Sequence, residues 1–120
     1  MKRVLLDTTV LVVNWRNPQI QPSQSDEVTN CINSITYIEF LQGANKRQTA
    51  DAKAFLNTFE HIRLDASISD KAIELIERHS HLDGLRLADA LIAATCLVLD
   101  LELVTFNRRH FQKIAGLKLI

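Results

Sequence analysis

The feature that most constrains the fold is a repeated alternation between short apolar runs and longer segments with helical spacing. The run Val4-Leu5-Leu6 ends abruptly at Asp7, as expected of a strand that is buried on both faces. Similar short runs recur along the chain, and segments with apolar residues on one helical face follow them. Strands that alternate with helices in this way predict a parallel sheet with helices on both faces, which is the α/β class.

The predicted elements cover most of the chain. Strands are expected at residues 4–6, 31–35, 62–64, 103–105 and 117–120. Helices are expected at residues 8–16, 36–44, 49–59, 67–79, 87–100 and 107–114. Together they predict one α/β domain over residues 1–120, with a central parallel sheet of about four to five strands flanked by helices.

Charge and cysteine usage narrow the classes of function. The 120 residues include 14 Lys and Arg against 14 Asp and Glu, so the formal net charge is zero. This balance argues against a protein that coats nucleic acid by bulk electrostatics, but it leaves room for a local basic patch beside a local acidic one. Cys31 and Cys96 lie in apolar runs without zinc-type spacing, which indicates buried thiols in a reducing compartment.

The sequence shows neither a membrane span nor a leader peptide. No apolar stretch approaches the ~20 residues that cross a bilayer. The apolar run at the N-terminus is interrupted by Asp7, and no small-residue cleavage site follows it. A soluble cytoplasmic protein is therefore predicted, with no membrane partner.

Three carboxylates are expected at the carboxyl edge of the sheet, where right-handed crossovers place the site of such folds. Asp7 follows the first strand, Glu39 lies in the first turn of the helix after the second strand, and Asp89 lies near the start of an apolar helix. Carboxylates that lie close together repel one another, and a divalent metal removes that repulsion. Oxygen ligands favour Mg²⁺ or Mn²⁺ over zinc.

Each carboxylate also has a purely structural interpretation. Asp7 could cap the helix that follows it, and Glu39 could complete a capping box with Thr36. Asp89 could simply favour the positive end of a helix dipole. Asp89 is the hardest to explain in this way, because it falls on a helical stripe that is otherwise apolar. A charge in that position is costly unless something pairs with it.

Further polar and basic residues surround these acids. They are Thr105 and Asn107 at the end of the fourth strand, with Arg86, Arg108 and His110 nearby. As a group the basic residues could hold a phosphate backbone across a metal centre. A solvated helix face is the alternative, and for the neighbouring Arg109 and Lys113 it is the preferred interpretation.

Four segments resemble the signature motifs of PIN-domain ribonucleases, in particular those of the VapC-type toxins of toxin–antitoxin pairs. In chain order they are residues 5–11, 35–43, 88–95 and 105–111, and the resemblance extends over nearly the whole chain. It implies a metal-dependent endoribonuclease with Asp7, Glu39 and Asp89 as ligands of Mg²⁺ or Mn²⁺. Such a centre activates a water for in-line attack on RNA phosphorus.

The resemblance also implies roles for neighbouring residues. Asn107 matches the polar residue of the fourth motif and joins the catalytic set, while Thr8 or Thr9 matches the hydroxyl residue that follows the first acid. The residues expected to contact the substrate are Thr8, Thr9, Arg86, Thr105, Arg108 and His110. His110 stands where many family members carry a fourth acid, which leaves the choice between one metal and two open.

By the same resemblance the partners are an RNA substrate, a small cognate antitoxin that covers the acidic edge, and a second copy of the chain in a homodimer. One alternative is a non-catalytic PIN module that keeps the fold and binds an antitoxin or RNA. A phosphoacceptor receiver domain of similar length is disfavoured, because the sequence lacks an acidic pair after the first strand and a lysine after a late strand.

Overall fold

The computed structural model describes residues 2–19, 27–79 and 84–120, and its centre is a four-stranded sheet in the order β3-β2-β1-β4. The strands are β1 (Lys2–Leu6), β2 (Val28–Asn33), β3 (Glu60–Ile62) and β4 (Glu102–Val104). β1 pairs with both β2 and β4, β2 pairs with β3, and every pairing is parallel. The predicted α/β class with a central parallel sheet is therefore confirmed.

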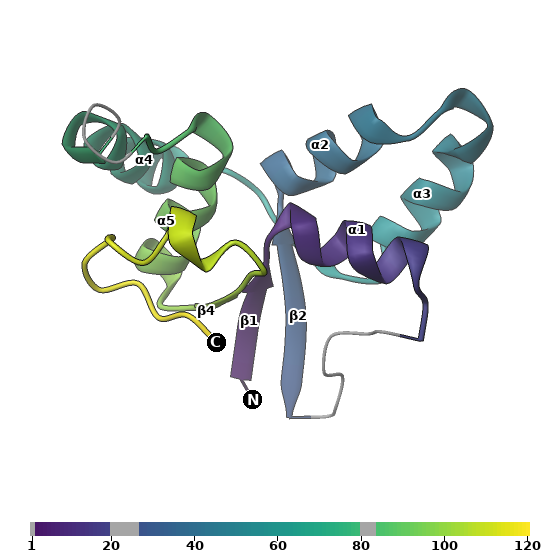
Figure 1. Ribbon diagram of the computed structural model, residues 1–120, viewed down its shortest axis with the longest axis horizontal. Helices are drawn as coiled ribbons and strands as arrows, with labels where there is room; N and C mark the ends of the chain where they lie inside the picture. The colour runs from purple at the N-terminus through teal and green to yellow at the C-terminus, as the bar shows by residue number, and fades with distance from the viewer. Residues whose placement is uncertain (1, 20–26, 80–83) are drawn as a thin grey trace.

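Helices cover both faces of this sheet. They are α1 (Thr8–Arg16), α2 (Ser34–Gly43), α3 (Thr49–Leu56), α4 (Ala66–His79) and α5 (Leu87–Leu99), with the short 3₁₀ helices η1 (Lys46–Gln48) and η2 (Arg108–His110). In Figure 1, α1, α2 and α3 lie on one side of the sheet and α4 and α5 on the other. Within the described residues, no helix has the length and apolar character needed to cross a membrane.

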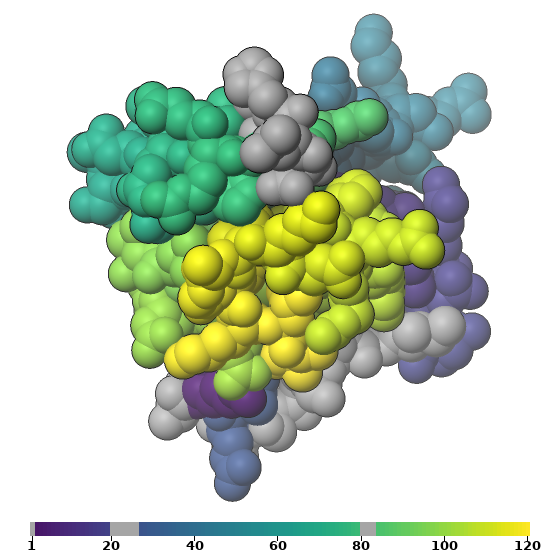
Figure 2. All heavy atoms as spheres, turned by 60° about the vertical axis from the view of Figure 1, so that its left-hand side comes forward, coloured from purple at the N-terminus to yellow at the C-terminus, as the bar shows by residue number. Residues whose placement is uncertain are grey.

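Alternate residues of the central strand feed two separate cores. Val4 and Leu6 pack with side chains of α1, α2 and α3, whereas Leu5 packs with those of α4 and α5. Successive side chains of a strand point to opposite faces, so a continuous apolar run is what a sheet covered on both sides requires. Phe111 and Ile114 complete the second core, and Figure 2 shows the C-terminal residues, in yellow, packed against the atoms of α4.

The boundary between β2 and α2 differs from the predicted one. β2 covers residues 28–33 instead of 31–35, and α2 begins at Ser34. The side chain of Asn33 explains the shift, because its Oδ1 accepts a hydrogen bond from the backbone N of Thr36 at 3.1 Å. This contact caps the helix and so ends the strand.

The C-terminal prediction was wrong in two places. The helix expected over residues 107–114 is reduced to η2 and turns, and the N-cap residue of η2, Asn107, makes no capping hydrogen bond with its side chain. The strand expected over residues 117–120 makes only an isolated parallel bridge between Leu103 and Leu119. Gly116, with a φ of 82°, turns the chain just before that bridge, so little extended backbone remains for pairing.

Candidate functional site

The carboxyl edge of the sheet contains a hollow of about 210 Å³. Its lining residues are Asp7, Thr8, Thr9, Glu39, Arg86, Ala88, Asp89, Ile92, Asn107 and His110. Eight of these ten were singled out from the sequence, and they come from segments that are far apart along the chain. Their convergence follows from the parallel sheet, which brings the ends of its strands to one edge.

Asp7 is fixed at the end of β1 by hydrogen bonds to both of its carboxylate oxygens. Oδ1 accepts from the backbone N of Thr9 at 2.6 Å and from the hydroxyl of Thr9 at 2.5 Å. Oδ2 accepts from the hydroxyl of Thr105, a buried residue that supports Asp7 from outside the hollow. Asp7 therefore caps α1, as its structural interpretation expected, and still borders the hollow.

Glu39 is oriented by α1 and not by the start of its own helix. Its Oε1 accepts a hydrogen bond from the hydroxyl of Thr8 at 2.8 Å, and that hydroxyl also lies 3.5 Å from the hydroxyl of Thr36. Because Asn33 caps α2, the alternative in which Thr36 and Glu39 form a capping box is not realised. The Glu39 carboxylate consequently remains at the hollow.

Asp89 lies in the first turn of α5 and pairs with His110. The Nδ1 atom of His110 lies 3.3 Å from Oδ2 of Asp89, whose side chain is only 17% exposed. Burial raises the pKa of the Asp89 carboxyl, the charges of Asp7 and Glu39 raise it further, and the charge of His110 opposes them. The three acids therefore interact electrostatically, although each is bonded to a different neighbour.

The donors at this edge suit a hard divalent cation, but their spacing is not that of an assembled metal site. Carboxylate, hydroxyl and amide oxygens predominate, which is the ligand chemistry of Mg²⁺ and Mn²⁺. Across residues 2–19, 27–79 and 84–120, no three His, Cys, Asp or Glu side chains are grouped closely enough to hold an ion. A cation bound here would have to draw Asp7, Glu39 and Asp89 together from their present partners.

Two buried polar residues behind the hollow were missed at the level of the sequence. Asn33 and Thr95 have no exposed surface, and Nδ2 of Asn33 donates to the hydroxyl of Thr95 at 3.1 Å. The same amide lies 3.4 Å from the carbonyl oxygen of Leu91. Asn33 thus ties α2, which carries Glu39, to α5, which carries Asp89. The available signal was a polar residue on each of two otherwise apolar segments.

The basic residues near the acids divide into two groups. Arg86 and His110 line the hollow, whereas Arg108 is exposed on η2 and is not among the lining residues. Arg109 and Lys113 are exposed too, and they border a separate hollow of about 190 Å³ that also includes His110. Of the predicted phosphate-binding residues, the structure therefore brings Arg86 and His110 closest to the acids.

Comparison with known protein families shows which family this chain belongs to. Residues 4–117 match the family described as PIN domain. This chain belongs to the PIN-domain family. The match extends over all four strands except the first residues of β1, and it contains every residue that lines the hollow. The fold and family expected from the four sequence motifs are therefore confirmed.

Two similar sequences carry ribonuclease names. This PIN domain is 29% identical over 124 residues to Ribonuclease VapC19 of Mycobacterium tuberculosis. The alignment covers 95% of this chain and 96% of the relative. It is 27% identical over 124 residues to Ribonuclease VapC1 of Methanocaldococcus jannaschii, with 98% of this chain and 86% of the relative covered.

Similar solved structures come from toxin–antitoxin assemblies. A toxin–antitoxin complex from Klebsiella pneumoniae contains a chain that is 29% identical to this PIN domain, with a TM-score of 0.74 over 98% of this chain and 95% of the other. The DNA-bound VapBC of Salmonella typhimurium gives a TM-score of 0.80 at 24% identity, covering 100% and 98% of the two chains. The second likeness concerns the fold alone.

Proposed function

We propose that this PIN domain is a divalent-metal-dependent endoribonuclease and the toxin of a toxin–antitoxin pair. The observation that carries the proposal is the hollow at the carboxyl edge, where Asp7, Glu39 and Asp89 interact electrostatically. The names of the relatives VapC1 and VapC19 support ribonuclease chemistry at this edge.

Asp7, Glu39 and Asp89 are the residues that would hold Mg²⁺ or Mn²⁺. When bound, such an ion supplies an activated water and stabilises negative charge during in-line attack on a phosphodiester. The chain contributes the orientation of the acids, since Thr8 holds Glu39 and Thr9 holds Asp7 through the hydrogen bonds described above. These hydrogen bonds keep both carboxylates at the edge of the hollow, from which a cation would draw them together with Asp89.

The remaining residues of the hollow act on the RNA. Arg86 supplies positive charge beside the acids, His110 adds an imidazole there, and Arg108 extends the positive charge onto the neighbouring surface, where it meets the phosphate backbone. Asn107 completes the catalytic set, with a side-chain amide that donates to a phosphate oxygen. Thr105 acts through these residues and not on the RNA directly. Its hydroxyl donates a hydrogen bond to Asp7 and accepts one from the backbone N of Asn107 at 2.9 Å.

The proposed partners are an RNA substrate, a cognate antitoxin and a second copy of the chain, all in the cytoplasm. The likeness to a chain of the Klebsiella pneumoniae toxin–antitoxin complex, at 29% identity over 98% of this chain, supports the antitoxin. An antitoxin that covers the acidic edge would keep the enzyme silent by excluding both metal and RNA.

RNA cleavage by the pure protein tests the proposed function. We expect cuts in the presence of Mn²⁺ and none in EDTA, with the cut positions read by sequencing the RNA ends. Asp7→Asn and Asp89→Asn should abolish cleavage because each removes a charge from the metal ligands. The matched control is Asp100→Asn, which removes an exposed carboxylate at the opposite end of α5. Unchanged cleavage by a folded Asp7→Asn/Asp89→Asn double variant would contradict the assignment.

A non-catalytic PIN module is the second candidate, and the pairing of His110 with Asp89 is the observation that favours it. In such a module, this contact would replace the metal as the partner of Asp89. Calorimetric titration with Mn²⁺ separates the two functions. The enzyme should bind Mn²⁺ in a manner that Asp89→Asn abolishes, whereas the module should bind none and leave RNA intact.

A further inference from the structure

A larger hollow lies beside the proposed catalytic one, between α1 and α2. Its volume is about 340 Å³, and its walls come from α1, α2 and the residues that lead into α3. Thr8 and Glu39 border both hollows, so the two adjoin at these residues. A molecule that extends out of the catalytic hollow past Glu39 therefore enters this second space.

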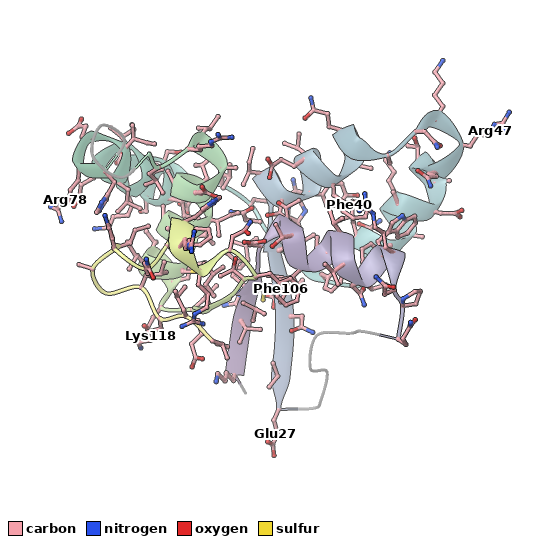
Figure 3. All side chains as sticks on the ribbon, in the orientation of Figure 1. Glu27, Phe40, Arg47, Arg78, Phe106 and Lys118 are labelled. Atoms are coloured by element: carbon pink, nitrogen blue, oxygen red, sulfur yellow. The ribbon has the colours of Figure 1, made fainter. Side chains whose placement is uncertain are left out.

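One wall of the second hollow is aromatic. Trp15 meets Phe40 edge-on, with ring centroids 5.6 Å apart and an interplanar angle of 85°, and it meets Phe55 at 5.2 Å and 55°. Figure 3 shows Phe40 on α2 facing α1. Neither phenyl ring lies parallel to the indole, and Trp15 remains partly accessible at the hollow. An aromatic side chain that is held in place and still accessible is suited to stacking an unpaired base.

The polar groups around Trp15 match the rest of a nucleotide. Arg16 is exposed at the end of α1 and lines the hollow, and the described residues include no carboxylate in an ion pair with it. Other exposed cations do form ion pairs: Nζ of Lys118, for example, lies 3.1 Å from Oδ1 of Asp100. Gln48 adds a side-chain amide whose Oε1 accepts from a backbone N at 3.3 Å, so its NH₂ group is the part left to donate. A cation suits a phosphate, and an amide suits a base edge.

We propose that this hollow is a nucleoside subsite that takes one unpaired base of the RNA, next to the bond that is cleaved. This inference rests on the proposed function, because it places a neighbouring nucleotide of the same substrate. The volume favours a nucleoside over a folded segment of a partner protein, since it lies near the lower end of small-ligand pockets, roughly 300–1,000 Å³. Because the two hollows adjoin at Thr8 and Glu39, a base in this one lies next to a phosphate at the acids.

Fluorescence gives a direct test, because Trp15 is the only tryptophan of the chain. The wild-type protein is titrated with AMP, CMP, GMP and UMP in turn, and with ribose 5-phosphate as the control that lacks a base. We expect saturable quenching of Trp15 emission by at least one nucleotide and none by ribose 5-phosphate. Equal quenching by ribose 5-phosphate, or no saturable quenching by any nucleotide, would overturn the subsite. The second result is also the one expected if the hollow takes a segment of an antitoxin.

Steady-state kinetics give a second readout that a merely structural role would not produce. Stacking on an aromatic side chain changes affinity by roughly 5- to 150-fold per base, so Trp15→Leu should raise KM within that range and leave kcat within about twofold. Trp15→Phe keeps an aromatic ring against Phe40 and should raise KM less. Arg16→Ala should raise KM as well, whereas Arg47→Ala, an exposed cation on η1 in Figure 3, should not.

These readouts separate the subsite from the proposed function. Base-dependent quenching without any RNA cleavage would leave the subsite standing and would refute the nuclease. Cleavage that depends on Asp89, with KM unchanged in folded Trp15→Leu and Trp15→Phe, would refute the subsite alone. Circular dichroism of both variants confirms folding, and Trp15→Phe serves if the leucine variant unfolds.

Discussion

Replacement of Asn33 by alanine should destabilise this protein more than its single polar side chain suggests. Asn33 is fully buried at the junction of β2 and α2, and it serves two helices at once. Its Oδ1 caps α2 through the backbone N of Thr36, and its Nδ2 donates to Thr95 on α5. No water can take over these contacts unless the junction opens.

The magnitude follows from the contacts that are lost. Loss of an asparagine N-cap costs about 1 kcal/mol, and loss of a buried hydrogen bond to a hydroxyl costs about the same. The void left by the amide adds roughly 1 kcal/mol. Asn33→Ala should therefore lower the free energy of unfolding by about 3 kcal/mol, a large share of the roughly 5–15 kcal/mol of a typical domain. The hydroxyl of Thr95 keeps one partner, the carbonyl oxygen of Leu91 at 2.8 Å, which limits the cost.

Urea unfolding followed by circular dichroism measures this change. Thr95→Val is the matched control, because it removes the contact between the two side chains, together with the bond of the Thr95 hydroxyl to the carbonyl oxygen of Leu91, and leaves the cap of α2 in place. Thr95→Val should cost about 1 kcal/mol. The double variant should be less destabilised than the sum of the single variants by a similar amount, because both remove the same bond. A loss below 1 kcal/mol in Asn33→Ala at unchanged m-value, or strict additivity, would refute the reasoning.

Three further predictions concern the thiols, the histidine on β3 and the metal. Burial raises the pKa of Cys31 to about 11 and that of Cys96 to about 12, so both should react with a thiol reagent at pH 8 only after urea unfolds the chain; rapid labelling of the native protein would contradict this. Burial, and then the charge of Arg63, lowers the pKa of His61 below 6.5, so the unfolded chain binds the proton more readily. Stability should therefore fall as the pH decreases below about 6.5, and urea unfolding of His61→Gln should show a smaller fall, whereas an equal fall would be inconsistent with the shift. Mn²⁺ at 100 times Kd should raise the free energy of unfolding of the wild type by about 2.7 kcal/mol, but not that of Asp7→Asn; an equal rise in both would place the ion elsewhere.

The sequence predicts the layered fold well because its strongest signals are local. The run from Val4 to Leu6 is apolar at every position, and this is enough to indicate a strand with helices on both sides. Once the sheet is parallel, the positions of Asp7 and Glu39 after neighbouring strands bring them to one edge. Asp89 reaches the same edge because α5 begins there.

The parts that could not be predicted depend on contacts between distant segments. Nothing local indicates that Thr8 would take Glu39 away from a capping box with Thr36, since that choice requires α1 to lie beside α2. The lengths of η2 and of the last strand-like segment also depend on distant contacts. The local helical and strand signals there are weak, and the packing of Phe111 in the core beside α5 overrides them. Propensity decides little in segments this short.

The sheet order has a consequence for the synthesis of the chain. β1 is made first and occupies the middle of the sheet, yet one of its two neighbours, β4, is made almost last. The hydroxyl that supports Asp7 belongs to Thr105, which is 98 positions away. A nascent chain that has exposed β1, β2 and β3 to solvent therefore still lacks one side of its central strand and the clamp on its first acid. The hollow cannot form its final shape until the C-terminal residues leave the ribosome, so premature termination yields no partly competent site.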